Sequence, residues 1–188
     1  DAIAQAVESL ISLKSNYKSV SYAKKSLKLS LNNYLSFLKK PNKVNSKNML
    51  IASNLAGKAI NISKTTAPHA ISYPFTSLFG IDHGHAVSLT LEKFLSFNFE
   101  NIKRSESNFK LSERYKIIFK LFKIKNIKEL SDKIKFLKKE AKLIDSFSDL
   151  GIDINLKSKK ILDQVNFLRL KNNPIKITKE DIIRILND

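Results

Sequence analysis

The chain has 188 residues, 43% of them hydrophobic, and its 34 Lys and Arg against 17 Asp and Glu give a formal net charge of +17. This length and apolar fraction suffice to bury one sizeable core, which excludes an intrinsically disordered protein. No apolar run approaches the roughly 18 residues that a membrane span needs. The absence of cysteine excludes disulfides and thiolate metal sites.

The basic excess is spread over both halves of the chain rather than gathered into one arm. A strongly basic protein can bind nucleic acid or an anionic membrane surface. Because no nucleic-acid motif accompanies the charge, we interpret it as a lysine-rich solvated surface. A basic helical module that binds nucleic acid or a protein partner is kept as the alternative of a different class.

Helical periodicity organises the first half. Between Ser21 and Leu38 the apolar residues recur at steps of four and three, and Pro41 closes this helix. Residues 46–63 are more continuously apolar and rich in small side chains, which predicts a central helix packed on several sides. Gly57 within it lowers helix propensity, so we expect a neighbouring backbone to approach closely there.

Helical spacing resumes in three later stretches, residues 85–98, 127–144 and 179–186. No segment alternates with period two between turn signals, so we expect no substantial sheet. The sequence therefore predicts an all-α helical bundle. We expect residues 1–100 to form its metal-site core and residues 101–188 to form a Lys-rich helical remainder of the same domain.

All three histidines lie in one segment, 64-KTTAPHAISYPFTSLFGIDHGHA-86. His69 and His83 are 14 residues apart, which suits two ligands from successive antiparallel helices joined by a turn. Asp1 and Gln5 share one helical face and offer a carboxylate and an amide oxygen. Such a set suits a borderline divalent ion, Fe²⁺ or Zn²⁺. The alternative is that the histidines are ordinary turn and cap residues.

Three segments resemble the C-terminal helical domain of the iron-containing alcohol dehydrogenases, which belong to the dehydroquinate synthase-like superfamily. They are DAIAQAVESLIS at the start, MLIASNLAGKAI at 49–60, and PHAISYPFTSLFGIDHGHAVSLTLEKFLSFN at 68–98. The resemblance implies that Asp1, Gln5, His69 and His83 are the metal ligands. Gln5 stands where most members have histidine, so the fourth ligand is expected to be weak.

The combination of D-A-x-A-Q, K-T-T-A-P-H-A-x-S-Y-P-F-T and H-G-H-A-V resembles the branch that includes phosphonoacetaldehyde reductases. Tyr73 departs from the family pattern, since many members have a second histidine there, and Asp82 replaces a common proline. The resemblance implies reduction of a small aldehyde, which could bear a phosphonate, by hydride transfer from NAD(P)H to a carbonyl polarised by the ion.

In this family the dinucleotide-binding domain lies N-terminal to the helical domain, and the chain contains no G-x-G-x-x-G. We therefore expect it to be the C-terminal, metal-binding half of a cytoplasmic NAD(P)-dependent alcohol dehydrogenase, inactive by itself and compatible with a homodimer. A degenerate dehydrogenase domain that lost its metal through Gln5 is the nearest alternative.

Three further side chains are candidates near the ion. His85 could relay a proton as a catalytic residue, or it could cap the helix that follows. Tyr73 could line the substrate pocket, or it could pack in the core. Glu8, one further turn along the Asp1 face, is a reserve ligand.

Lys64, Thr65 and Thr66 precede the first ligand histidine. An ammonium group with hydroxyl or backbone donors at a helix N-terminus can bind a phosphonate, so these residues are candidates for substrate binding. The alternative is an exposed loop lysine followed by capping threonines.

Overall fold

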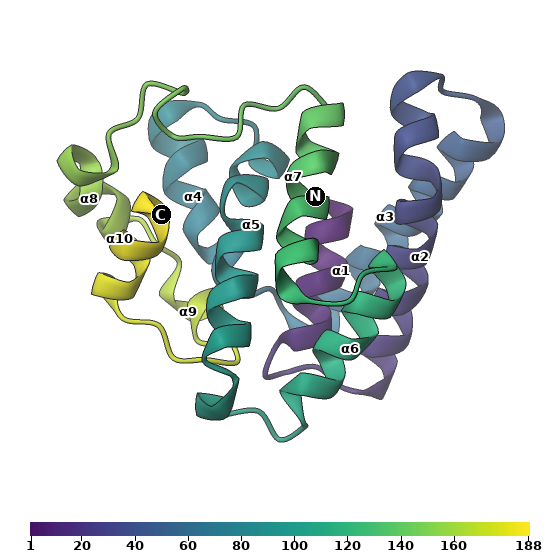
Figure 1. Ribbon diagram of the computed structural model, residues 1–188, viewed down its shortest axis with the longest axis horizontal. Coiled ribbons are helices and arrows are strands. Elements are labelled where there is room, and N and C mark those ends of the chain that lie inside the picture. Colours follow the sequence, from purple (N-terminus) through teal and green to yellow (C-terminus); the bar gives the residue numbers. More distant parts are fainter.

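The structure, a computed structural model, describes residues 1–188 as ten α-helices and one 3-10 helix, with no strand (Figure 1). The elements are α1 (Ala2–Ile11), α2 (Tyr17–Lys39), α3 (Lys43–Ser63), α4 (Ala67–Phe79), α5 (His83–Glu100), η1 (Ile102–Arg104), α6 (Leu111–Phe122), α7 (Ile127–Glu140), α8 (Ile154–Asp163), α9 (Phe167–Leu170) and α10 (Lys179–Asn187). The predicted all-α bundle is confirmed. None of the helices has the length together with the hydropathy that a membrane span requires.

The short helix α1 lies at the centre of the molecule (Figure 1). It packs against α2, α3, α5 and α6. Its apolar residues Ala6, Val7, Leu10 and Ile11 are completely buried. Because α1 is surrounded by its neighbours, residues 6–12 are buried, whereas Asp1 at its N-terminal end is exposed.

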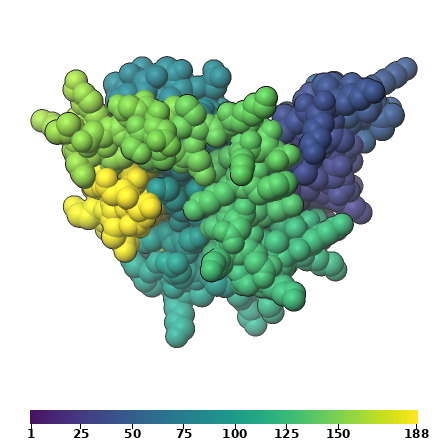
Figure 2. All heavy atoms as spheres, turned by 45° about the horizontal axis from the view of Figure 1, so that its top comes forward, coloured from purple at the N-terminus to yellow at the C-terminus, as the bar shows by residue number.

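The α2–α3 hairpin forms one edge of the molecule and projects beyond it (Figures 1 and 2). The prediction that residues 46–63 form a central helix is therefore wrong, since Leu50 is 73% exposed and Ile51 is 40% exposed. Only the small residues face inward, where the Ser26 hydroxyl donates to the Ala52 carbonyl at 2.7 Å. The small side chains lie on the face that packs against α2 and α1, while the opposite face of α3 is open.

The expected backbone contact at Gly57 is also wrong. A Cβ atom built at this position would meet no heavy atom within 4 Å. The glycine lies on the open side of α3, so its cost in helix propensity is not compensated by close packing.

Two of the other predicted helices have bounds that differ from those predicted from the sequence. α2 begins at Tyr17, because the Asn16 side chain accepts a hydrogen bond from the Ser19 amide at 3.0 Å and caps the helix. α7 ends at Glu140, before the predicted 144, because the chain turns with Lys142 in the left-handed region at φ +57°. Ile144 lies outside the helix and is 44% exposed.

A proline inside α4 creates a docking point for α9. Pro74 has no N–H, so it cannot make the helical hydrogen bond to the Ala70 carbonyl. That carbonyl instead accepts the Asn166 amide at 3.0 Å. Asn166 is also the N-cap of α9 and accepts the Arg169 amide at 3.1 Å. The carbonyl that Pro74 leaves free in α4 therefore anchors the start of α9.

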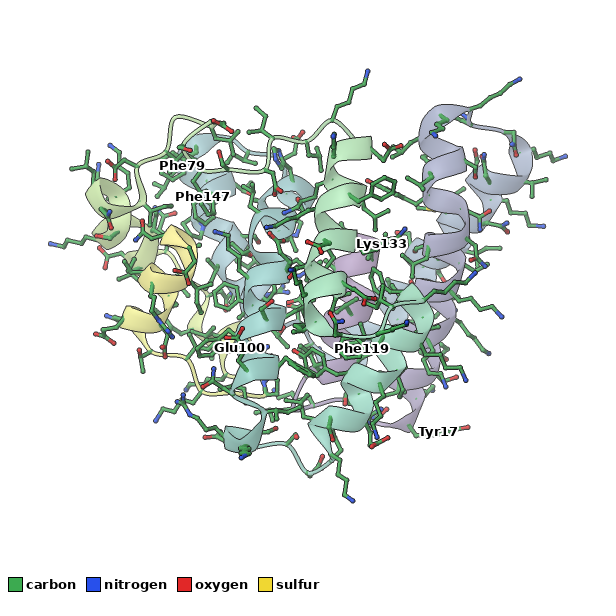
Figure 3. The ribbon with its side chains drawn as sticks, in the orientation of Figure 1. Tyr17, Phe79, Glu100, Phe119, Lys133 and Phe147 are labelled. Carbon is green, nitrogen blue, oxygen red and sulfur yellow. The ribbon has the colours of Figure 1, made fainter.

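The hydrophobic core is one cluster that runs from Ala4 to Leu186. Its members come from both sides of residue 100, and Phe147 stacks on Phe75 of α4 with ring centroids 4.6 Å apart. Figure 3 shows Phe147 beside Phe79. Phe79 lies one turn after Phe75 on α4 and stacks on it. The division at residue 100 stays a prediction about organisation, within a core that both parts share.

A buried ion pair ties α7 to α5. The Lys138 ammonium donates to both carboxylate oxygens of Glu92 at 2.9 and 3.0 Å, and both residues are under 5% exposed. Asp145, in the loop after α7, contacts the same ammonium. Removing two charges from water is costly, so this pair depends on its mutual contacts.

Replacing Lys138 with methionine should lower the free energy of unfolding by about 3–5 kcal/mol, because the buried Glu92 carboxylate would lose its cation. Replacing Lys138 by methionine and Glu92 by leucine together should recover most of that loss, since an apolar pair of similar volume often matches a buried ion pair. Urea denaturation measures both effects. Lys139→Met, an exposed change on the same helix, is the control and should stay within about 0.5 kcal/mol. Equal effects at positions 138 and 139 would contradict the interpretation.

Candidate metal centre

Three side chains from three helices converge at one point. Asp1 is the N-cap of α1, His69 is the third residue of α4 and His83 is the first residue of α5. One ligand atom from each lies within 4.8 Å of the others. The two imidazole centroids are 5.3 Å apart. The predicted approach of His69 to His83, with the Asp1 helix beside them, is confirmed as geometry.

The turn between α4 and α5 brings the two histidines together. Gly80 ends α4 in the left-handed conformation at φ +67°, and its amide bonds back to Thr76 at 3.1 Å. Gly84 lets α1 approach, because a Cβ at this position would already touch the Asp1 Cβ at 3.4 Å. A larger side chain there would push Asp1 away from His83.

Glu8 holds His69 from behind. Its carboxylate is completely buried, and one oxygen accepts hydrogen bonds from the Thr66 amide and hydroxyl, both at 2.9 Å. The same oxygen accepts the His69 amide at 3.3 Å. The other oxygen contacts His69 Nδ1. A carboxylate on α1 therefore caps the N-terminus of α4 and orients a side chain on it.

This contact decides which ring nitrogen of His69 is available. With Nδ1–H donated to Glu8, a neutral imidazole carries its lone pair on Nε2, which lies 3.1 Å from an Asp1 oxygen. Burial alone raises the pKa of the Glu8 carboxyl, but the charge and hydrogen bond of His69 and the bonds from Thr66 outweigh it and lower that pKa. Glu8 is therefore held in its ionised form, as an acceptor.

The Gln5 side chain lies against Asp1, as their shared helical face predicted. Its amide nitrogen donates to the second Asp1 oxygen at 2.6 Å. The Gln5 amide thus orients Asp1 while its own oxygen remains a candidate ligand. Its role as a weak fourth ligand stays a prediction.

His83 is the solvent-facing member of the centre. Its ring is exposed, whereas His69 is 2% exposed. Burial of part of the ring lowers the pKa of His83, and the positive charges of His69, of the Asp1 ammonium and of Arg169 lower it as well. A lowered pKa favours the neutral imidazole that a metal requires.

Tyr73 and His85 occupy different surroundings. Tyr73 lies one turn after His69 on α4, and its ring centroid is 6.2 Å from that of His83, so it borders the centre. His85 points to the loop after α7, where Nε2 is 2.6 Å from the Ile144 carbonyl. This contact fits a histidine that fixes a loop. The catalytic role of either residue stays a prediction.

The three residues proposed for substrate binding have separate partners. The exposed Lys64 ammonium donates to the Asn61 carbonyl at 2.8 Å, at the end of α3. Thr66 is buried and its hydroxyl is used by Glu8. Thr65 is also buried, and its hydroxyl accepts a hydrogen bond from Arg169 at 2.8 Å. Neither threonine offers a free hydroxyl beside Lys64.

A cavity of about 900 Å³ lies elsewhere. It opens between α5, α7 and α10, and Figure 2 shows part of α5 at the bottom of this hollow. Its lining includes Glu92, Lys93, Asp145 and Arg184 but none of the converging ligands. This cavity is therefore separate from the centre, which is defined by its donor atoms.

The fold of the chain is that of a known family. The profile described as "Fe-containing alcohol dehydrogenase family, C-terminal" matches residues 1–188. The chain belongs to the iron-containing alcohol dehydrogenase family. The match extends over the whole chain, beyond the first hundred residues that carried the resemblance in sequence.

Three relatives describe this similarity. The phosphonoacetaldehyde reductase of Streptomyces viridochromogenes is 45% identical over 47 residues, which are 25% of this chain and 12% of that protein. The sulfoacetaldehyde reductase from Bifidobacterium kashiwanohense, solved in complex with NAD⁺, is 27% identical with a TM-score of 0.84, covering 100% of this chain and 47% of its own. An archaeal halo-thermophilic alcohol dehydrogenase from a Red Sea brine pool has a TM-score of 0.87 at 22% identity, over 100% of this chain and 48% of its own, and supports the fold alone. The chain thus spans about half the length of the solved relatives it matches.

The donor set fits the metal that the family name implies. One carboxylate and two imidazoles suit a borderline divalent ion such as Fe²⁺ or Zn²⁺. Histidines that bind metals usually donate their second ring nitrogen to a carboxylate or carbonyl, and Glu8 accepts from His69 in this way. From the sequence, Glu8 was expected only as a reserve ligand, and Arg169 was not expected near the centre.

Replacing Glu8 with glutamine in the complete protein should weaken metal binding roughly 10- to 100-fold, the range typical of such outer partners. An amide N–H facing His69 Nδ1 would favour the tautomer that protonates Nε2 and removes the lone pair. Titration of the metal-free protein with Fe²⁺ or Zn²⁺ measures the effect without any assay of turnover.

Glu113→Gln is the matched control, since this glutamate is exposed on α6 and should leave metal affinity unchanged. If Glu8→Gln bound metal as tightly as the native protein, while circular dichroism showed a native fold, Glu8 would have no part in orienting the ligand.

Proposed function

We propose that the complete protein is an NAD(P)H-dependent aldehyde reductase, working also as an alcohol dehydrogenase in reverse, and that this chain is its metal-binding half. The observation that carries the proposal is the convergence of Asp1, His69 and His83, with Glu8 behind His69, in a member of this family. A divalent ion bound there, Fe²⁺ or Zn²⁺, would act as a Lewis acid that polarises the substrate carbonyl.

Each side chain of the centre has a distinct part in this proposal. Glu8 keeps the His69 ring in one orientation, so that Nε2 is presented without a search among rotamers. Asp1 supplies the negative charge that offsets part of a cation's charge, and Gln5 orients it. His83 and Asp1 are exposed, which leaves one side of the centre open to a substrate.

The nicotinamide cofactor would be held by another part of the protein. The sulfoacetaldehyde reductase relative was solved with NAD⁺, and this chain covers 47% of it. The chain itself contains no Gly-rich strand-to-helix turn. A dinucleotide-binding domain preceding the helical half, a cytoplasmic location and a homodimer all belong to the proposal.

The names of two relatives suggest the substrate class. Phosphonoacetaldehyde and sulfoacetaldehyde are both two-carbon aldehydes that end in a tetrahedral anion. We propose that the complete protein reduces a short aldehyde of this kind. Lys64, with Thr65 and Thr66, was expected to bind the anion, and that assignment stays a prediction alongside the contacts described above.

Two alternatives remain open to experiment. A degenerate domain would retain the fold but bind no metal, whereas a basic interaction module would bind DNA or RNA in a strongly salt-dependent way. The first is disfavoured by the centre itself, which keeps a carboxylate and two imidazoles without using Gln5 as a ligand. The metal content of the purified complete protein separates the reductase from both alternatives, and salt-dependent binding of DNA or RNA separates the two alternatives from each other.

His83→Ala in the complete protein should lose bound metal and NAD(P)H-dependent turnover together, because one of two imidazole ligands is removed. The loss of affinity should exceed the roughly 10- to 100-fold typical of outer partners. Gln5→His should act in the opposite direction, since an imidazole is a stronger ligand than an amide for these ions. Elemental analysis after gel filtration measures metal content.

His85→Ala serves as the control, because its ring contacts the Ile144 carbonyl, and it should retain metal. If it keeps its metal but loses turnover, a proton-relay role for His85 gains support. Retention of metal and turnover by His83→Ala would place the centre elsewhere.

A further inference from the structure

Arg169 is a half-buried cation without a carboxylate partner. It lies on α9 and takes no part in any ion pair of the structure, whereas Arg184 pairs with Asp181 at 3.0 Å. Of its five N–H groups, one donates to a protein acceptor, the Thr65 hydroxyl at 2.8 Å. A guanidinium that is partly removed from water retains strong donor capacity for an anion.

The position of this guanidinium is fixed by the elements that build the metal centre. Asn166 anchors α9 to the Ala70 carbonyl on α4, one residue after His69. The hydroxyl that Arg169 contacts belongs to Thr65, and the next residue, Thr66, bonds to Glu8. Arg169 is therefore held against the N-terminal end of the ligand helix.

One aromatic ring separates this cation from the exposed ligand. The Arg169 guanidinium carbon lies 5.4 Å from the Tyr73 ring centroid, and that ring lies 6.2 Å from the His83 ring. Tyr73 thus borders both groups and can support a small molecule that reaches from one to the other.

We propose that Arg169 binds the tetrahedral oxyanion of the substrate, a phosphonate or a sulfonate, and thereby determines specificity for short anionic aldehydes. This inference rests on the proposed aldehyde reductase function. The planar guanidinium presents paired N–H donors that match two oxygens of such an anion, which a lysine ammonium cannot do. Held there, the anion would place the aldehyde at the metal centre, and binding energy from the remote charge would orient the carbonyl.

The experiment compares Arg169→Gln, Arg169→Lys and Lys64→Ala in the complete, metal-loaded protein. The first measurement is the ratio of kcat/KM for phosphonoacetaldehyde to kcat/KM for propanal. The second is the dissociation constant of ethylphosphonate, which carries the anion but no aldehyde, by calorimetry. Sulfoacetaldehyde and ethylsulfonate, tested in the same way, distinguish a phosphonate site from a sulfonate site.

Arg169→Gln should lower the specificity ratio and raise the ethylphosphonate dissociation constant roughly 10- to 150-fold, the range of one charge-assisted contact. Arg169→Lys keeps the charge but loses the paired N–H donors, so its specificity ratio and dissociation constant should lie between those of Arg169→Gln and the native protein. A merely structural role for Arg169, in holding Thr65 or Tyr73, would lower both kcat/KM values together and leave the ratio unchanged. That outcome would overturn the inference, as would a loss of preference in Lys64→Ala with none in Arg169→Gln.

Arg114→Gln is the matched control. Arg114 is also half-buried, without an ion pair and over an aromatic ring, 4.5 Å from the Phe109 centroid, but it lies on α6. It should leave ethylphosphonate binding unchanged. If the native protein reduces propanal as well as phosphonoacetaldehyde, the reductase proposal stands and the anion site is refuted. If it reduces neither aldehyde, the reductase proposal fails, and calorimetry still decides whether Arg169 binds the anion.

Discussion

The buried carboxylate of Glu8 is the interaction on which the centre depends. A charged group without contact to water is tolerated only when it is fully hydrogen-bonded, and Glu8 receives bonds from Thr66 and His69. These contacts join the central helix α1 to the start of α4. The same contacts that make the burial of Glu8 possible also orient the His69 ring, a candidate ligand, so one side chain contributes both to the core and to the geometry of the candidate site.

A second polar connection positions the chain just before α4. The Ser12 hydroxyl donates to the Ser63 carbonyl at 2.6 Å, and the Ser63 hydroxyl donates to Ser9 at 2.8 Å. All three residues are completely buried. They tie the end of α3 to α1, one helical turn beyond Glu8. The α3–α4 connection is therefore held from both sides, and the histidine that follows it starts from a defined position.

Periodicity predicted α2, α3, α5, α7 and α10, and the turn with its glycines predicted that His69 and His83 are neighbours. No prediction was made for α6, α8 and α9, whose segments are short. The role of Glu8 was not predictable, since a carboxylate on the Asp1 face has the same spacing whether it binds a metal or a ligand histidine. Arg169 gave no signal at all, because its contact with Thr65 joins residues 104 apart in the chain. The prediction that α3 is a central helix was wrong because small apolar residues also suit an edge helix that packs on one face only.

The hydrogen bond that α4 lacks at Pro74 leaves a backbone carbonyl free to attach α9. One attachment of α9, between the Ala70 carbonyl and the Asn166 amide, is made by backbone atoms alone and does not depend on the side chains that follow. Leu168, on the same short helix, is 79% exposed and has little part in the core. Leu170 belongs to the core, but substitutions at Arg169 can change the group presented towards the centre while the attachment persists. On the proposal that Arg169 binds the substrate anion, this position is one where substrate preference can diverge in evolution without loss of the fold.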